Sequence, residues 1–278
     1  MLIPRFWARE SGASTDPKGK LYQFNVWGWS QKSSADALTM ARRRLSQLVS
    51  RIAQGEPAGA YFYGKQPPRE EIIRSLGEPG SRAEAVVTRN RYGALVLNTA
   101  QVPFIDVDSP RVGVIARFVR LFRRNPQPDP TLERIRQACR RRDRHVFRIY
   151  RTRAGYRVLA TDLYIDPRAE STRDFLSGFA ADPYFIKLCG LQGSFRARLT
   201  PKPWRCGCPL PPGRHPREGD RLQRDFGVWL SSYESVSARF ASCKYLESVG
   251  SGRTSPESRE IVEEHDRVSR ALSDLPLA

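Results

Sequence analysis

The 278-residue sequence contains no run of about 20 apolar residues, which is the length a membrane-spanning helix needs. We therefore expect no membrane partner. The first residues, MLIPRFWARESG, lack the basic segment and apolar core of a secretory signal, which favours a cytoplasmic protein. The five cysteines are an odd number in a chain long enough to bury its own core, so we expect reduced thiols rather than a disulfide scaffold.

Several catalytic signatures are also missing. The chain has no G-x-S-x-G, no G-x-x-x-x-G-K-[ST] and no G-x-G-x-x-G, so hydrolase, P-loop NTPase and dinucleotide-binding functions have no direct support. A nucleophilic cysteine or serine needs a base within hydrogen-bond reach, and only His145, His215 and His265 are available. The sequence around His145 and around His265 does not indicate that either histidine pairs with a cysteine, so nucleophilic catalysis is not predicted.

Acidic residues are few relative to basic ones, because 29 Asp and Glu stand against 47 Lys and Arg and the net charge is +18. Such an excess favours an anionic partner, and nucleic acid is the one we expect. Only seven of the basic residues are Lys, so an Arg-rich genome could produce much of the excess without selection for binding. The Arg clusters at 42–44, 117–124 and 140–144 either contact phosphates or form solvated helix faces.

Apolar residues make up 40% of the chain, which is enough for a packed core. Strand-like and helix-like segments alternate, which predicts an α+β fold with a mixed or mainly antiparallel sheet and helices packed on it. Residues 1–20 are predicted to be a flexible lead and residues 21–202 the α+β core. Residues 203–278 are predicted to be a Pro-rich loop followed by a partly helical C-terminal appendage, since six prolines lie between 201 and 220.

Local patterns predict the individual elements. Strands are expected at 21–30 and 60–64, three times within 83–108, twice around the turn at Gly155 within 145–162, and at 183–189 and 194–200. Helices are expected from a cap at Ser33 or Ser34 to the breakers Gly55 and Pro57, at 67–77, 111–124 and 131–144, from about 169, and at 256–273. The segment 226–246 is expected to be helical or mixed.

Two aspartates end the third strand of the 83–108 segment, in the stretch VPFIDVDSP. Because side chains alternate along a strand, Asp106 and Asp108 share one face while Ile105 and Val107 point the opposite way into apolar packing. Two carboxylates on one face can share Mg²⁺ or Mn²⁺, which takes further ligands from substrate phosphates. An Asp-x-Asp is also an ordinary way to end a strand, so a strand terminator is the alternative.

The order of these elements is a strand with Asp-x-Asp, a helical segment, a strand, a Gly-containing turn and a strand. It resembles the catalytic core of the archaeo-eukaryotic primase superfamily, which includes the primase-polymerases, over residues 84–202. The resemblance implies that FIDVD carries the first catalytic acid pair, Asp106 and Asp108. It also implies that the turn YRTRAGYRVLA contacts a nucleotide. Most of the chain is also similar to bacterial proteins that suggest no function.

The sequence departs from the family at that turn. Where the family has a nucleotide-contacting histidine, this chain offers Arg157, with Arg151 earlier in the same hairpin. A guanidinium can grip a triphosphate but cannot act as a neutral imidazole would, which places nucleotide binding ahead of catalysis. The family's third acid has two candidates, Asp162 and Asp182, and each could equally be a turn or cap residue.

A basic segment follows. FRARLTPK offers Arg196 and Arg198 on one strand face, with Lys202 nearby, and it resembles the basic strand that follows the third acid in the family. The resemblance implies that these three residues contact nucleotide or nucleic acid. Alternation alone would also place both arginines on a solvated face.

A second, separate metal site is suggested by C-x-C-x₆-H in the Pro-rich loop. Cys206, Cys208 and His215 are zinc-type ligands, although the spacing is not that of a zinc finger. A fourth ligand would have to come from Cys243, Cys189 or an acid elsewhere. The alternative is a rigid proline loop with incidental thiols.

These patterns together predict a nucleic-acid-associated protein with a primase-like core. It would bind a nucleoside triphosphate and could act as a nucleotidyltransferase that uses Mg²⁺ or Mn²⁺ at Asp106 and Asp108. The alternative is a binding protein that keeps the scaffold and the basic surface without the chemistry. Arg157 favours the alternative, and the intact acid pair favours the enzyme.

Overall fold

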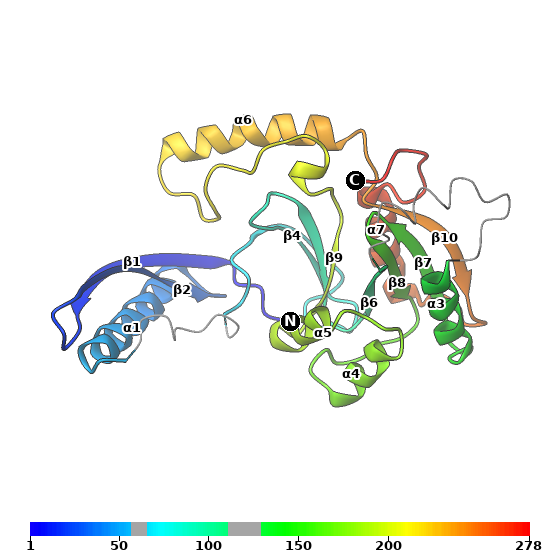
Figure 1. Cartoon of the computed structure of the whole chain (residues 1–278), viewed down its shortest axis with the longest axis horizontal. Coiled ribbons are helices and arrows are strands. Elements are labelled where there is room, and N and C mark those ends of the chain that lie inside the picture. The colour runs from blue at the N-terminus through cyan, green and yellow to red at the C-terminus, as the bar shows by residue number, and fades with distance from the viewer. Residues whose placement is uncertain (57–65, 111–128) are drawn as a thin grey trace.

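The computed structural model describes residues 1–56, 66–110 and 129–278, and it has an α+β fold (Figure 1). The predicted fold class is confirmed, and all the paired strands of the two larger sheets are antiparallel. No helix in this part of the chain is long and apolar enough to cross a membrane. The strand predicted at 60–64 and the helix predicted at 111–124, with its arginines, lie outside the described residues.

Two four-stranded sheets form the main body. The first has the order β10-β7-β8-β6, with β10 at Cys243–Val249, β7 at Phe147–Thr152, β8 at Gly155–Ala160 and β6 at Phe104–Asp108. The second has the order β3-β4-β5-β9, with β3 at Glu71–Leu76, β4 at Ala85–Arg89, β5 at Leu95–Thr99 and β9 at Phe195–Arg198. Strand β6 lies beside β9, so the two sheets adjoin, and one apolar core runs through both.

Turn chemistry explains the hairpins. Between β4 and β5, the Asn90 side chain accepts hydrogen bonds from the backbone N–H groups of Tyr92 and Ala94, and Gly93 has a φ of +81°. Asparagine and glycine are the residues that such a turn favours. The predictions of three strands in 83–108 and of the β7–β8 hairpin are therefore confirmed.

Helices α3 (Pro130–Arg140) and α7 (Pro256–Ser269) lie beside the first sheet, and α4 (Glu170–Ser177) contacts helix α5 (Pro183–Gln192) (Figure 1). Helix α7 begins at a Ser255 cap followed by proline, a strong start signal. Its residues Ile261, His265 and Ser269 are spaced four apart and are all buried, so one stripe of the helix faces the protein interior.

The elements between Phe6 and Ala53 form an arm that projects from the main body, while the N-terminus lies beside the main body (Figure 1). Strands β1 (Phe6–Thr15) and β2 (Leu21–Ser30) pair along their whole length, and helix α1 (Ser34–Ala53) packs on them. A small cluster of Val26, Leu48 and Ile52 forms the arm's own core. The prediction of a flexible lead over residues 1–20 is wrong, because β2 supplies the hydrogen-bonding partner that these polar residues lack alone.

Two further local predictions are wrong. The segment predicted as a helix at 67–77 contains β3, because its backbone pairs with the edge of β4. The strand predicted at 183–189 is instead helix α5 (Pro183–Gln192). Asp182 caps α5 by accepting hydrogen bonds from two backbone N–H groups, and proline follows it, so the start signal for a helix is stronger than the strand propensity of the apolar residues.

The C-terminal quarter is not an appendage. After the short 3₁₀ helix η2 (Pro203–Arg205) and α6 (Asp220–Ser237), β10 joins the first sheet and α7 contributes to the main core. The Pro-rich loop is instead held against α6 by a small cluster that includes Phe226, Trp229 and Tyr233.

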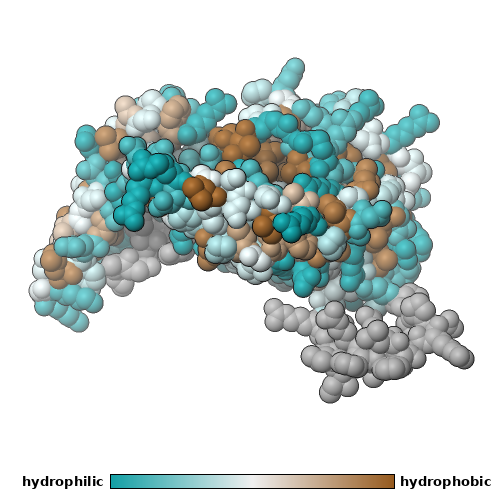
Figure 2. All heavy atoms as spheres, turned by 90° about the horizontal axis from the view of Figure 1, so that it is seen from above, coloured by the Kyte–Doolittle hydropathy of each residue, from teal (hydrophilic) through white to brown (hydrophobic). Residues whose placement is uncertain are grey.

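Hydrophilic and apolar side chains are interspersed on the face seen from above (Figure 2).

Candidate nucleotide-binding cleft

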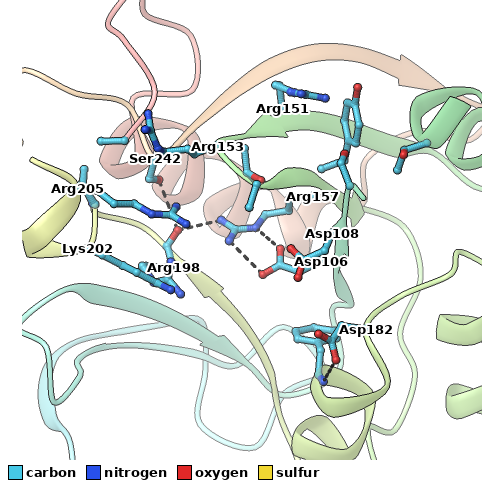
Figure 3. Close-up of a pocket in the computed structure, with 18 of the residues that line it drawn as sticks. Asp106, Asp108, Arg151, Arg153, Arg157, Asp182, Arg198, Lys202, Arg205 and Ser242 are labelled. Carbon is cyan, nitrogen blue, oxygen red and sulfur yellow. Dashed lines mark hydrogen bonds and ion pairs between the residues drawn. The ribbon is translucent and has the colours of Figure 1, made fainter. Parts of the chain in front are cut away.

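A cavity of about 960 Å³ lies where the two sheets adjoin (Figure 3). It is lined by residues of β6, β8, α5 and β9 and by the segment that follows β9. Its acidic residues are Asp106, Asp108, Asp129 and Asp182, and its basic residues are Arg151, Arg153, Arg157, Arg198, Lys202 and Arg205. Charges of both signs therefore face one space.

Asp106 and Asp108 both reach this cavity from β6. Ile105 and Val107 are buried in the core, so the predicted alternation is confirmed. Asp108 lies opposite Gly155 of β8, and a Cβ at Gly155 would overlap the carbonyl oxygen of Val107. Glycine thus permits the close approach of the β7–β8 turn to the acidic strand.

Arg157 forms an ion pair with Asp106. The two residues are direct partners in the β6–β8 register, and Arg157 Nε lies 2.9 Å from Asp106 Oδ1 while Nη2 lies 3.4 Å from Oδ2. Arg157 is only 4% exposed, so its charge needs a counter-ion, and Asp106 supplies it. The predicted site residue Arg157 is therefore at the cavity, with two of its three nitrogens directed at the carboxylate.

Asp108 has different surroundings. Burial, together with the negative charges of Asp182 and Asp106, raises the pKa of its carboxyl above the usual value. Among the described residues, none donates a hydrogen bond to this carboxylate at hydrogen-bonding distance. A cation placed here would relieve the repulsion between the carboxylates.

The structure distinguishes the two candidates for the third acid, because only one of them lines the cavity. Asp182 both caps α5 and lines the cavity across from Asp108 (Figure 3). Asp162 accepts a hydrogen bond from the Val146 backbone N–H at 3.0 Å and is not a cavity residue, so its role is local. Of the two candidates, Asp182 is therefore the one that lines the cavity with Asp106 and Asp108.

Asp129 is a cavity residue that the sequence patterns did not predict. It caps α3, and its Oδ2 accepts hydrogen bonds from the hydroxyl of Tyr156 at 2.7 Å and from Arg151 at 3.0 Å. These donors hold the pKa of Asp129 below the usual value although burial opposes them. The Asp-Pro sequence before α3 signals a cap, but no local signal places that cap at the cavity.

A cationic wall stands opposite the acids, and we define it as Arg153, Arg198, Lys202 and Arg205 (Figure 3). Within residues 1–56, 66–110 and 129–278, no carboxylate lies within 4.0 Å of any of the four. Burial and mutual repulsion lower the pKa of Lys202 and of Arg205. Four like charges held together in this way favour an anionic ligand.

Arg196 and Arg151 have partners of their own. Arg196 lies 2.7 Å from both carboxylate oxygens of Glu70 and is not a cavity residue, so the structure does not bring it to the predicted site. Arg151 lines the cavity and is paired with Asp129. The predicted basic residues that remain available to a ligand are thus Arg198 and Lys202.

The predicted metal sites differ in how well they fit. Mg²⁺ needs only one or two carboxylates when phosphates complete its ligands, and Asp108 with Asp106 fits that requirement. For zinc, Cys206 and Cys208 are buried against aromatic side chains, whereas the charged neighbours of His215 are Glu71, Arg217 and Arg69. No three His, Cys, Asp or Glu side chains in the described part of the chain are grouped as a metal site, and zinc stays a prediction for elemental analysis.

The structure also pairs a cysteine with a histidine. Cys243 Sγ lies 3.8 Å from Nε2 of His265, and both residues are fully buried. A substrate cannot reach them, so the pair does not form a nucleophilic site. The contact joins β10 to α7 and follows from tertiary packing alone.

In comparisons with known proteins, the chain matches no family model, no curated protein and no solved structure.

Proposed function

We propose that this chain is a nucleic-acid-associated protein with a primase-like core that binds a nucleoside triphosphate in the cavity between the two sheets, which we call the cleft. The observation that carries the proposal is the opposition of the cationic wall to the carboxylates of Asp106 and Asp108 across one cavity. A triphosphate with a divalent cation has this charge pattern, since its phosphates are anionic and its cation prefers carboxylate oxygens.

The reaction class that suits this arrangement is nucleotidyl transfer. A hydroxyl group loses its proton to water and its oxygen forms a bond to the α-phosphorus, while the bond from that phosphorus to the bridging oxygen breaks and pyrophosphate leaves. The cationic wall would hold the phosphates, while Asp108 and Asp106 would hold Mg²⁺ or Mn²⁺. Such a cation, when bound, supplies electrostatic stabilisation of the phosphoryl oxygens.

One observation favours a binding protein without this chemistry. Both oxygens of Asp106 already accept hydrogen bonds from Arg157, so Asp106 has less charge to offer a cation than a free carboxylate would. In this second candidate function, the cleft binds nucleotide or nucleic acid phosphates and no bond is made.

Calorimetric titration with a nucleoside triphosphate and Mn²⁺ tests binding. We expect saturable binding by the wild type and a loss of about tenfold or more in Lys202→Ala/Arg205→Ala, because two charge-assisted contacts are removed. Arg82→Ala/Arg173→Ala removes the same charge from exposed positions outside the cavity and should bind as the wild type does. No binding by the wild type, or equal loss in both double variants, would refute the proposal.

Extension of a labelled primer on a template separates the two functions. Transferase activity should require Mg²⁺ or Mn²⁺, release pyrophosphate and be lost in Asp108→Asn. Triphosphate binding without any extension or dinucleotide synthesis would select the non-catalytic function.

A further inference from the structure

Arg157 has a second set of contacts behind the cleft. Its Nη1 lies 2.9 Å from the carbonyl oxygen of Arg198 and 3.3 Å from Nε2 of His265. His265 belongs to α7 and is separated from Arg157 by 108 positions in the sequence. The guanidinium that neutralises Asp106 is therefore held from its far side by a residue that does not face the cavity.

Hydrogen-bond chemistry defines the form of the imidazole. A guanidinium can only donate, so Nε2 must accept from Arg157 and carry no proton. The proton then lies on Nδ1, which is 3.0 Å from Oδ1 of Asp266 and donates to it. Asp266 is in turn held by Arg148, whose Nη2 lies 2.5 Å from Oδ2.

Cys243 offers a competing arrangement. A thiolate at Cys243 would pair with an imidazolium, and that pairing would raise the pKa of His265 and lower that of Cys243, against the effect of burial on each. Nε2 lies 3.3 Å from Nη1 of Arg157 and 3.8 Å from Sγ of Cys243, and because sulfur is the larger atom these lengths by themselves do not rank the two contacts. A guanidinium has only N–H groups to direct at Nε2, and an imidazolium N–H facing them would be repelled, so the contact with Arg157 favours the neutral form.

We propose that His265 is a positioning residue whose neutral imidazole, oriented by Asp266, holds the guanidinium of Arg157 against Asp106. The chain Asp266–His265–Arg157–Asp106 thereby links α7 to the acidic wall of the cleft. The orientation of Arg157 follows from these contacts alone. Its consequence for ligand binding rests on the proposed function.

Two substitutions separate the contacts of His265. In His265→Gln, the side-chain oxygen can replace Nε2 as the acceptor for Arg157. In His265→Asn, the shorter amide can replace Nδ1 as the donor to Asp266 but does not reach Arg157. A purely structural role, in which the ring only fills space beside Phe104 and Tyr150, predicts that both variants behave alike.

Nitrogen NMR of the wild type tests the form of the ring without any ligand. We expect an unprotonated Nε2 and a protonated Nδ1 on the buried histidine, assigned by its disappearance in both variants. A protonated Nε2, in either the other tautomer or an imidazolium, would overturn the proposal.

The Nε–H signal of Arg157 reports its orientation, and Arg157→Lys assigns the signal by removing it. Its protection from exchange should fall about tenfold or more in His265→Asn, because a hydrogen bond to a charged group is lost, and should be largely kept in His265→Gln. Binding of a triphosphate with Mn²⁺ should follow the same order. If protection of the Arg157 Nε–H is unchanged in both variants, or falls equally in both, the positioning role is refuted. If protection falls only in His265→Asn, as expected, but the wild type binds no triphosphate, only the proposed function is refuted.

Discussion

At the scale of the residue, Asp106 and Asp108 differ in what their charges do. Asp106 neutralises a buried guanidinium, whereas Asp108 is repelled by Asp182 and Asp106 and has no such partner among the described residues. Two carboxylates that share a strand face therefore contribute to stability with opposite signs.

We expect Asp106→Asn to lower the free energy of unfolding by about 2 kcal/mol, because it leaves the charge of Arg157 uncompensated in a buried site. Asp108→Asn should leave stability unchanged or raise it, since it removes a repelled charge. Chemical denaturation of both variants at neutral pH, without divalent cations, measures the difference. Equal losses in the two variants would contradict the asymmetry and favour a strand terminator.

Gly155 allows the turn to approach the acidic strand. Gly155→Ala should destabilise the protein by about 2 kcal/mol, because the added Cβ overlaps backbone atoms of Val107 and Ser109. Gly227→Ala is the matched control, since no atom lies within 4 Å of its added Cβ and the residue is in α6. The free energy of unfolding of that control should rise by up to about 1 kcal/mol, because alanine has the higher helix propensity. Thermal unfolding of both variants tests whether Gly155→Ala lowers stability while Gly227→Ala raises it.

At the scale of the element, helix α7 is fastened to the first sheet by charge as well as by apolar packing. Asp266 is 8% exposed and contacts both Arg148 of β7 and His265 of its own helix. Burial alone would raise the pKa of Asp266, but the hydrogen bond from His265 and the charge of Arg148 lower it below its usual value.

This lowered pKa gives a pH dependence. A carboxyl whose folded-state pKa is below its unfolded value adds stability that is complete above the unfolded value of about 4 and is lost as the pH falls through the folded value. We expect Asp266→Asn to be less stable than the wild type at pH 7, and the gap to narrow below pH 4 or so. Urea unfolding across this pH range measures the gap. A gap that is constant with pH would contradict an ionised Asp266.

At the scale of the whole molecule, the cleft exists because two sheets adjoin. The acids come from β6 of one sheet, and most of the cationic wall comes from β9 of the other sheet and the segment after it. Ligand contacts on both walls would therefore bridge the two sheets.

The net charge of +18 predicts mixed-sequence nucleic acid binding that weakens steeply with salt. If about six phosphates are contacted, affinity should fall by roughly a thousandfold between about 50 and 200 mM salt, because bound counter-ions are released on association. Fluorescence anisotropy across this range gives the slope, and Lys202→Ala/Arg205→Ala should reduce it more than Arg82→Ala/Arg173→Ala. An absence of binding at 50 mM salt would contradict the prediction.

Local sequence patterns were sufficient to predict a structural feature where the interactions that stabilise it are between residues close in the sequence. The β4–β5 and β7–β8 hairpins follow from turn residues at Asn90, Gly93 and Gly155 between apolar runs, and the shared face of Asp106 and Asp108 follows from strand alternation. Residues 183–189 also carried a local signal, the Asp-Pro cap of α5, but their apolar content suggested a strand.

The remaining features depend on partners far away in the sequence. Residues 6–15 and 71–76 are strands because β2 and β4 supply their hydrogen bonds, which no periodicity within either segment encodes. Likewise, the sequence alone determined that Asp106 is on the same strand face as Asp108. Only the tertiary structure decided that Arg157 neutralises Asp106 and that His265 holds Arg157, because side chains 51 and 108 positions apart meet only when sheet and helix pack together.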